Sequence, residues 1–91
     1  MSLLRYNARR DDNEPALVKC LEQLGFHVTT VSGKGVPDLI LSRRQLFHLA
    51  EIKAPTGRDR PAQINFRAKH SAPVHRLVTV EDCVKLSQTV P

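Results

Sequence analysis

The sequence lacks the features that would place it in a membrane, in the secretory pathway or around a disulfide. It has no apolar run near the roughly 18 residues that a membrane span needs. The opening segment MSLLRYNARRDDNE has neither a sustained apolar core nor a cleavage signature, so no secretory signal is predicted. The two cysteines, Cys20 and Cys83, are far apart and each lies in an apolar pattern. We therefore expect two core residues in a reducing cytoplasm, rather than a bridge or a metal site.

Acidic residues are also in the minority. The 91 residues include 14 Lys and Arg against 9 Asp and Glu, which gives a formal net charge of +5. This balance favours an anionic partner, of which nucleic acid is the commonest, although a merely basic domain remains the alternative. The length and the 41% hydrophobic content predict one globular domain over residues 1–91, with its core at about 9–88.

Hydrophobic periodicity predicts an α/β protein of order α-β-β-β-α-β-α, with a mixed four-stranded sheet flanked by helices. Asp11 or Asp12 is expected to cap the first helix and Asp59 the second. The short polar turn at 43–45 predicts an antiparallel hairpin, whereas the fourth strand follows a helix and is free to lie parallel to its neighbour. The expected helices cover 11–25, 61–70 and 81–88, and the expected strands cover 26–32, 36–42, 46–54 and 74–80.

Charged residues interrupt the apolar hairpin strands. Side chains alternate along a strand, so Glu51 and Lys53 share one face. In the antiparallel hairpin the start of one strand meets the end of the other, which places Asp38 opposite Glu51. Two adjacent carboxylates resist ionising together, and a hard divalent cation such as magnesium or manganese removes that penalty. The alternative is an ordinary cross-strand salt bridge from Asp38 or Glu51 to Lys53.

Two helical residues and a glycine loop are further candidates. Glu14 falls on the same helical face as Val18 and Leu21, so it points along the apolar stripe; alone, it fits an acid favoured by the helix dipole. Gln63 lies near the start of the second helix, and a solvent-facing side chain is an equal alternative. The loop at 33–35 has two glycines, which permit positive φ and the close approach of a backbone or a phosphate.

The assembled motifs resemble a known family. Pro37-Asp38 followed by Glu51-Ile52-Lys53 is similar to the PD-(D/E)xK nuclease motif. Over about residues 9–85 the chain resembles the VRR-NUC nuclease domain, of which stand-alone copies occur in phages and bacteria. The segments that carry this resemblance are RRDDNEPALVKCLEQLG, SGKGVPDLIL, LAEIKAPTG, PAQINF and VTVEDC.

The resemblance implies a restriction-endonuclease-like core and a magnesium-dependent deoxyribonuclease, with Mn²⁺ able to substitute for Mg²⁺. It implies metal ligation by Asp38, Glu51, the main-chain carbonyl of Ile52 and Glu14. Lys53 and Gln63 complete the implied catalytic set, and the products would carry a 5′-phosphate and a 3′-hydroxyl. Pro15, directly after Glu14, departs from the family pattern. It could shift the start of the helix and the direction in which the Glu14 carboxylate points.

We expect duplex or branched DNA as the partner, with a four-way junction plausible by analogy, a homodimer, and the cytoplasm of a bacterium or of a phage-infected cell. Arg58 and Arg60 are expected nearest the cut. The remaining expected DNA contacts are Lys34, Arg9 and Arg10, while Arg43 and Arg44 would serve a longer substrate, a dimer contact or solubility. The alternatives to an endonuclease are a non-catalytic DNA-binding module on the same scaffold and a structural domain with an acid–lysine salt-bridge network.

Overall fold

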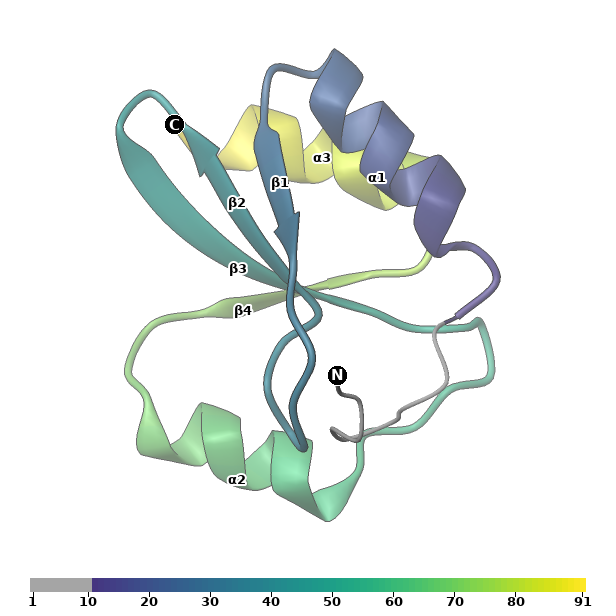
Figure 1. Cartoon of the computed structure of the whole chain (residues 1–91), viewed down its shortest axis with the longest axis vertical. Coiled ribbons are helices and arrows are strands. Elements are labelled where there is room, and N and C mark those ends of the chain that lie inside the picture. The colour runs from purple at the N-terminus through teal and green to yellow at the C-terminus, as the bar shows by residue number, and fades with distance from the viewer. Residues whose placement is uncertain (1–10) are drawn as a thin grey trace, which may run out of the picture.

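The computed structural model describes residues 11–91. It confirms the predicted element order and the α/β class with a mixed four-stranded sheet and three helices (Figure 1). The helices are α1 (Glu14–Gln23), α2 (Pro61–Lys69) and α3 (Val80–Thr89). The strands are β1 (His27–Thr30), β2 (Leu39–Arg43), β3 (Leu46–Ile52) and β4 (Val74–Leu77). In residues 11–91, no helix is long and apolar enough to cross a membrane.

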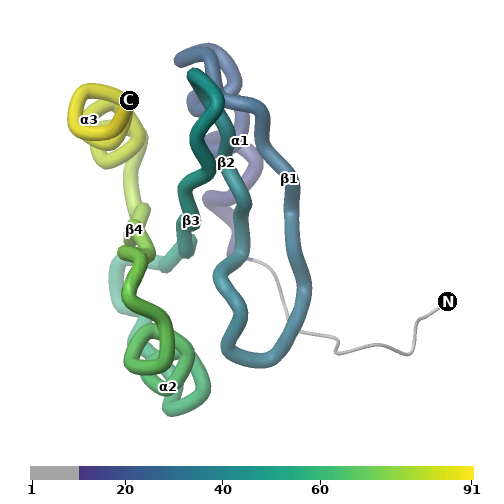
Figure 2. Tube along the Cα trace, turned by 90° about the vertical axis from the view of Figure 1, so that its left-hand side faces the viewer, coloured from purple at the N-terminus to yellow at the C-terminus, as the bar shows by residue number. Residues whose placement is uncertain are grey.

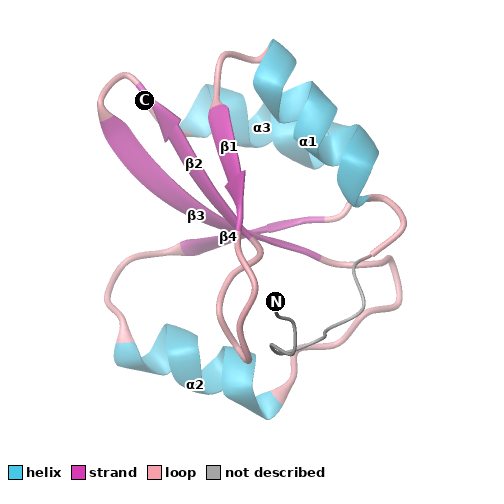
Figure 3. Ribbon diagram, in the orientation of Figure 1, coloured by secondary structure: helices cyan, strands magenta, loops and turns pink. Residues whose placement is uncertain are grey.

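The sheet has the order β1-β2-β3-β4. The β1–β2 and β2–β3 pairs are antiparallel, so the predicted hairpin is confirmed, and β4 lies parallel to β3. Figure 3 shows the strands converging near the middle of the molecule, with α1 and α3 together on one side and α2 apart from them. Parallel pairing of β4 follows from the crossover through α2, which returns the chain in the direction of β3.

The hydrophobic core lies between the sheet and the α1–α3 pair. Leu17 and Leu21 of α1 and Leu86 of α3 are buried there, which confirms the predicted apolar stripe of the first helix. Cys83 is buried and Cys20 half-buried, and both are free thiols, as the sequence predicted. Burial raises the pKa of Cys83 to about 11, which keeps this thiol protonated at neutral pH.

Two predicted helix caps are wrong. The N-cap of α1 is Asn13, and its side chain makes no capping hydrogen bond. Its amide instead donates to the carbonyl oxygens of Lys53 (3.1 Å) and Val78 (2.8 Å), which ties the start of α1 to the ends of β3 and β4. The N-cap of α2 is Arg60 rather than Asp59.

Arg43 holds the chain together at the far end of the hairpin. Its guanidinium donates hydrogen bonds to the carbonyl oxygens of Leu24, Ser87, Val90 and Pro91. It also stacks over the Phe26 ring at 4.2 Å from the centroid. Arg43 therefore uses its donors within the chain, on carbonyl groups at the C-terminal ends of α1 and α3, and its expected part in DNA binding, a dimer contact or solubility stays a prediction. Arg44, in the turn itself, is exposed.

Candidate active site

The hairpin brings Asp38 and Glu51 together at one end of the sheet. The β2–β3 ladder pairs Leu39 with Ala50, so Asp38 and Glu51 are the next residues along and face each other, as predicted. Oδ2 of Asp38 accepts a hydrogen bond from the backbone N–H of Ile52 at 2.8 Å. This bond fixes the Asp38 carboxylate against the end of β3.

Glu51 and Lys53 are buried, with only 2% and 6% of their surfaces exposed. Ala50 and Ile52, which alternate with them, belong to the hydrophobic core, so Glu51 and Lys53 point to the opposite side of the sheet. Charged groups are rarely buried unless they are paired. Each of the two therefore needs partners, and the structure supplies them from α2 and the loop before it.

Lys53 is held by the loop after β3 and by α2. Its ammonium donates to Oε1 of Gln63 at 2.6 Å and to the carbonyl oxygen of Arg58 at 3.1 Å, and lies 3.7 Å from Oδ1 of Asp59. Gln63 is fixed in turn, because its Oε1 also accepts from the backbone N–H of Arg60 at 2.9 Å. The predicted Gln63 therefore contacts Lys53 directly rather than facing solvent.

Arg67 connects Glu51 to Asp59. One guanidinium nitrogen lies 3.3 Å from Oε2 of Glu51 and the other 2.5 Å from Oδ2 of Asp59. Burial raises the pKa of Glu51 above its usual value, although Lys53 and Arg67 oppose this shift. The hydrogen bond from Arg67 lowers the pKa of Asp59. Among residues 11–91, the ion pairs of Lys53 and Glu51 are thus with Asp59 and Arg67, not the cross-strand pair that the sequence suggested.

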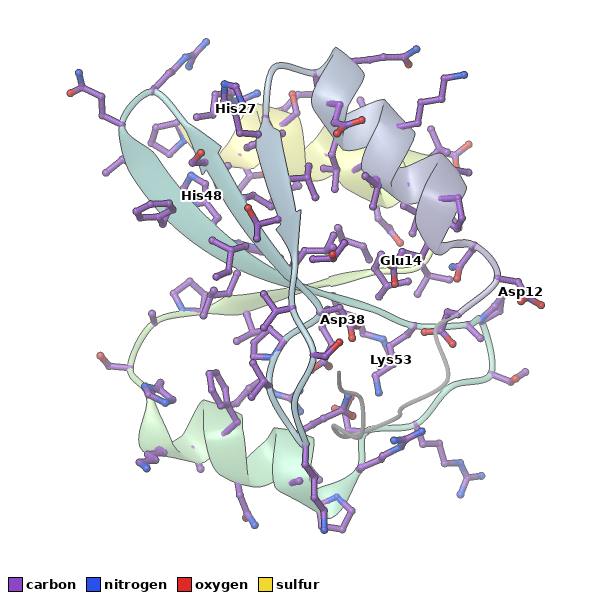
Figure 4. The ribbon with its side chains drawn as sticks, viewed as in Figure 1. Asp12, Glu14, His27, Asp38, His48 and Lys53 are labelled. Atoms are coloured by element: carbon purple, nitrogen blue, oxygen red, sulfur yellow. The ribbon has the colours of Figure 1, made fainter. Side chains whose placement is uncertain are left out.

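A cavity of about 690 Å³ opens beside this network. Asp38 and Lys53 line it, and Figure 4 shows both side chains in the space between the strand ends and α2. Lys34, Arg58 and Arg60 are exposed and also line the cavity. The structure therefore brings these three predicted DNA contacts to one opening, while Arg9 and Arg10 lie outside the described residues.

Figure 2 shows the glycine loop between β1 and β2 beside α2. The three residues of this loop, 33–35, line the cavity. Gly35 has φ +78°, and a Cβ there would lie 2.6 Å from the carbonyl oxygen of Ala62. Close approach to a backbone, one of the two uses predicted for this loop, is thereby confirmed at Gly35.

Glu14 lies on α1 at the end nearest Asp38 and Lys53 (Figure 4). Its side chain lines a neighbouring groove with Val18 and Thr30, whereas Asp11 lines the cavity of Asp38 and Lys53. The part assigned to Glu14 in metal binding stays a prediction.

The donor set suits a hard cation. Within residues 11–91, no group of three or more His, Cys, Asp and Glu side chains is placed to hold a metal ion. Asp38 and Ile52 line the cavity, and Glu51 is adjacent in the ladder, so the candidate ligands are two carboxylates and a main-chain carbonyl. Mg²⁺ commonly binds through one or two carboxylates and keeps several waters, so these oxygen donors fit it.

Sequence reasoning missed three residues of the site. From the sequence, only a helix cap is predicted at Asp59, and no role is predicted for Asn13 or Arg67. The i, i+4 spacing of Gln63 and Arg67 on one helical face was the available signal for Arg67. Asn13 and Asp59 act across long sequence separations or from an irregular loop, for which the sequence offered no signal.

Comparisons with protein-family models, with curated proteins and with solved structures found no match to this chain.

Proposed function

We propose that this chain is a metal-dependent DNA endonuclease on a restriction-endonuclease-like core. The observation that carries the proposal is that Asp38 and Lys53 line one cavity with basic residues at its opening, while the buried Glu51 lies next to them in the hairpin. Two carboxylates can hold a cation against a phosphate, and a neighbouring lysine can offset the negative charge that develops during phosphodiester hydrolysis. The sequence resemblance to the VRR-NUC domain supports the same reading.

Asp38, Glu51 and the carbonyl of Ile52 would hold the cation. When bound, Mg²⁺ would polarise a phosphoryl oxygen and lower the pKa of a coordinated water. Lys53 offsets negative charge that develops on the phosphate and orients the attacking water. Gln63 and the Arg58 carbonyl position the Lys53 ammonium through the hydrogen bonds described above. Lys34, Arg58 and Arg60 bind neighbouring phosphates of the backbone.

Two other readings use the same residues differently. A non-catalytic DNA-binding module would retain the basic opening but would not cut DNA. A structural domain would use the ion pairs among Lys53, Asp59, Arg67 and Glu51 only for stability. The melting temperature of such a structural domain would not change when a divalent cation is added.

The proposal is tested by incubating the protein with duplex, flap, splayed-arm and four-way DNA in Mg²⁺ or in EDTA. Cleavage of at least one substrate in Mg²⁺ but not in EDTA is expected. Asp38→Asn should abolish cleavage, whereas Asp12→Asn, at an exposed position outside the cavity, should not. DNA binding without cleavage of any substrate in Mg²⁺ or Mn²⁺ would favour the non-catalytic module instead.

A further inference from the structure

The guanidinium of Arg67 lies between two carboxylates, as a bound cation would. It contacts Oε2 of Glu51 with one nitrogen and Oδ2 of Asp59 with the other. Only 3% of the Glu51 side chain is exposed, against 32% of the Arg67 side chain. The acid is therefore fixed and enclosed, while its cationic partner reaches it from a half-exposed helix position.

Arg67 and a divalent cation would need the same carboxylate. Glu51 has Asp38 beside it in the hairpin and Arg67 reaching it from α2. A cation that binds Asp38 and Glu51 would add positive charge within a few ångströms of the guanidinium. At such distances like charges repel strongly even at the effective dielectric constant of a protein.

We propose that Arg67 is a built-in counter-ion of the site, which neutralises Glu51 while no divalent cation is bound and competes with that cation for the Glu51 carboxylate. The inference rests on the proposed function. Asp59 allows a cation to replace Arg67 at Glu51. Its bond to the second guanidinium nitrogen keeps Arg67 paired after the contact between Arg67 and Glu51 is broken. Oδ1 of Asp59 accepts no hydrogen bond among residues 11–91 and lies 3.7 Å from the Lys53 ammonium, so this carboxylate is close to both cations of the network.

A counter-ion and a purely structural ion pair predict different consequences of removing Arg67. If the pair is only structural, its loss lowers stability and either weakens cation binding or leaves it unchanged. If Arg67 is the counter-ion, its loss also lowers the stability of the cation-free protein, because a buried acid is left unpaired. It nevertheless strengthens cation binding, because the competing charge is gone.

The test is calorimetric titration of Mn²⁺ into the parent and three variants at pH 8, together with melting temperatures in EDTA. Arg67→Met removes the charge and keeps an aliphatic side chain. Arg67→Gln also removes the charge but retains a hydrogen-bond donor, and it serves the same comparison if the Met variant does not fold. Lys69→Met is the matched control, since it removes a positive charge from an exposed position on the same helix.

Either neutral variant at position 67 should bind Mn²⁺ at least about tenfold more tightly than the parent. Its melting temperature in EDTA should fall by roughly 4–8 °C or more. Lys69→Met should change the affinity by less than about twofold, because exposed charges are screened. Unchanged or weaker Mn²⁺ binding by both position-67 variants would overturn the inference.

Glu51→Gln separates this failure from failure of the proposed function. If Glu51→Gln abolishes Mn²⁺ binding and the Arg67 variants bind like the parent, the metal site stands and only the counter-ion is wrong. If Glu51→Gln binds Mn²⁺ like the parent, or if neither the parent nor the Arg67 variants bind it, the metal site itself is wrong and the inference falls with it.

Discussion

The ammonium of Lys53 lies 2.6 Å from Oε1 of Gln63, which links the end of β3 to the first turn of α2. A lysine side chain has four rotatable carbon–carbon bonds and would otherwise sample many positions. The same Gln63 oxygen accepts the Arg60 backbone N–H, so the amide cannot turn away without breaking two bonds. Gln63 is therefore a positioning residue for Lys53.

Gln63→Ala is expected to lower the cleavage rate by about 10- to 100-fold, because a displaced Lys53 no longer meets the reacting phosphate. Stability should fall by about 1–3 kcal/mol, the cost of leaving a buried charged donor with one partner fewer. DNA affinity in Ca²⁺ should stay within a few fold of the parent. Gln88→Ala, at an exposed site on α3, is the control for a change of Gln to Ala. A Gln63→Ala rate equal to that of the control would show that Lys53 is positioned without Gln63.

Arg43→Ala is expected to destabilise the fold by about 2–4 kcal/mol, because carbonyl groups at the C-terminal ends of α1 and α3 lose their donors. Loss of the stacking on Phe26 adds to the effect. Arg44→Ala, the exposed neighbour in the turn, should change stability by less than about 0.5 kcal/mol. Urea unfolding of the two variants measures both values. Similar stabilities would mean that the Arg43 hydrogen bonds contribute little.

His75 is expected to make the fold sensitive to mild acid. Burial lowers its pKa below the usual 6.5, and the neighbouring His48 ring, 6.3 Å away between centroids, lowers it further. Below pH 6.5 the unfolded chain therefore binds a proton that the folded chain does not, so stability falls as the pH falls from 6.5 toward the folded pKa. Above pH 6.5 this contribution is fully present.

The measurement is the free energy of unfolding in urea between pH 7.5 and 5. His75→Phe retains an aromatic ring without a titrating group, so its loss of stability over this range should be smaller than that of the parent. His27→Phe, at an exposed position on β1, should follow the parent. Parallel curves for His75→Phe and the parent would exclude His75 as the source of the acid sensitivity.

Arg58 and Arg60 are expected to bind phosphates at the opening of the cavity. Each phosphate that a protein neutralises releases counterions, which makes binding depend on salt. Replacing both residues by Ala should weaken DNA binding and flatten the slope of log K against log salt by roughly one to two units. The loss should be alike for unrelated sequences of one DNA shape. Fluorescence anisotropy in Ca²⁺ across a salt series measures the slope, and a double variant with the parent slope would place the phosphate contacts elsewhere.

The sequence predicted the fold well because its signals were local. The Leu17–Leu21 stripe and the alternation along β3 follow from single elements, and the hairpin register, which brings Asp38 opposite Glu51, follows from its short turn. The helix caps failed because tertiary contacts overrode local preference. The N-cap position of α1 falls on Asn13 rather than on Asp11 or Asp12, and the Asn13 amide binds carbonyl groups at the ends of β3 and β4. Asp59 pairs with Arg67 instead of capping α2.

The site was predicted less completely than the fold. Asp38, Glu51 and Lys53 lie on one hairpin, so alternation and register suffice to bring them together. The partners that neutralise Glu51 and Lys53 come from α2 and from the loop before it, at positions that depend on how α2 packs. The hydrogen bonds from Arg43 to carbonyl groups at the C-terminal ends of α1 and α3 could likewise not be predicted from the sequence pattern.

The most direct measurement of the central claim compares DNA cleavage with DNA binding in Lys53→Met, which keeps most of the lysine side-chain volume. The proposed nuclease predicts that cleavage in Mg²⁺ is lost by about 100-fold or more while DNA affinity in Ca²⁺ stays within a few fold of the parent. Circular dichroism and a melting curve show that the variant is folded, and Lys85→Met, at an exposed position on α3, is the matched control and should cut like the parent. A folded Lys53→Met protein that cuts DNA at the parent rate would contradict the claim that Lys53 serves the chemistry.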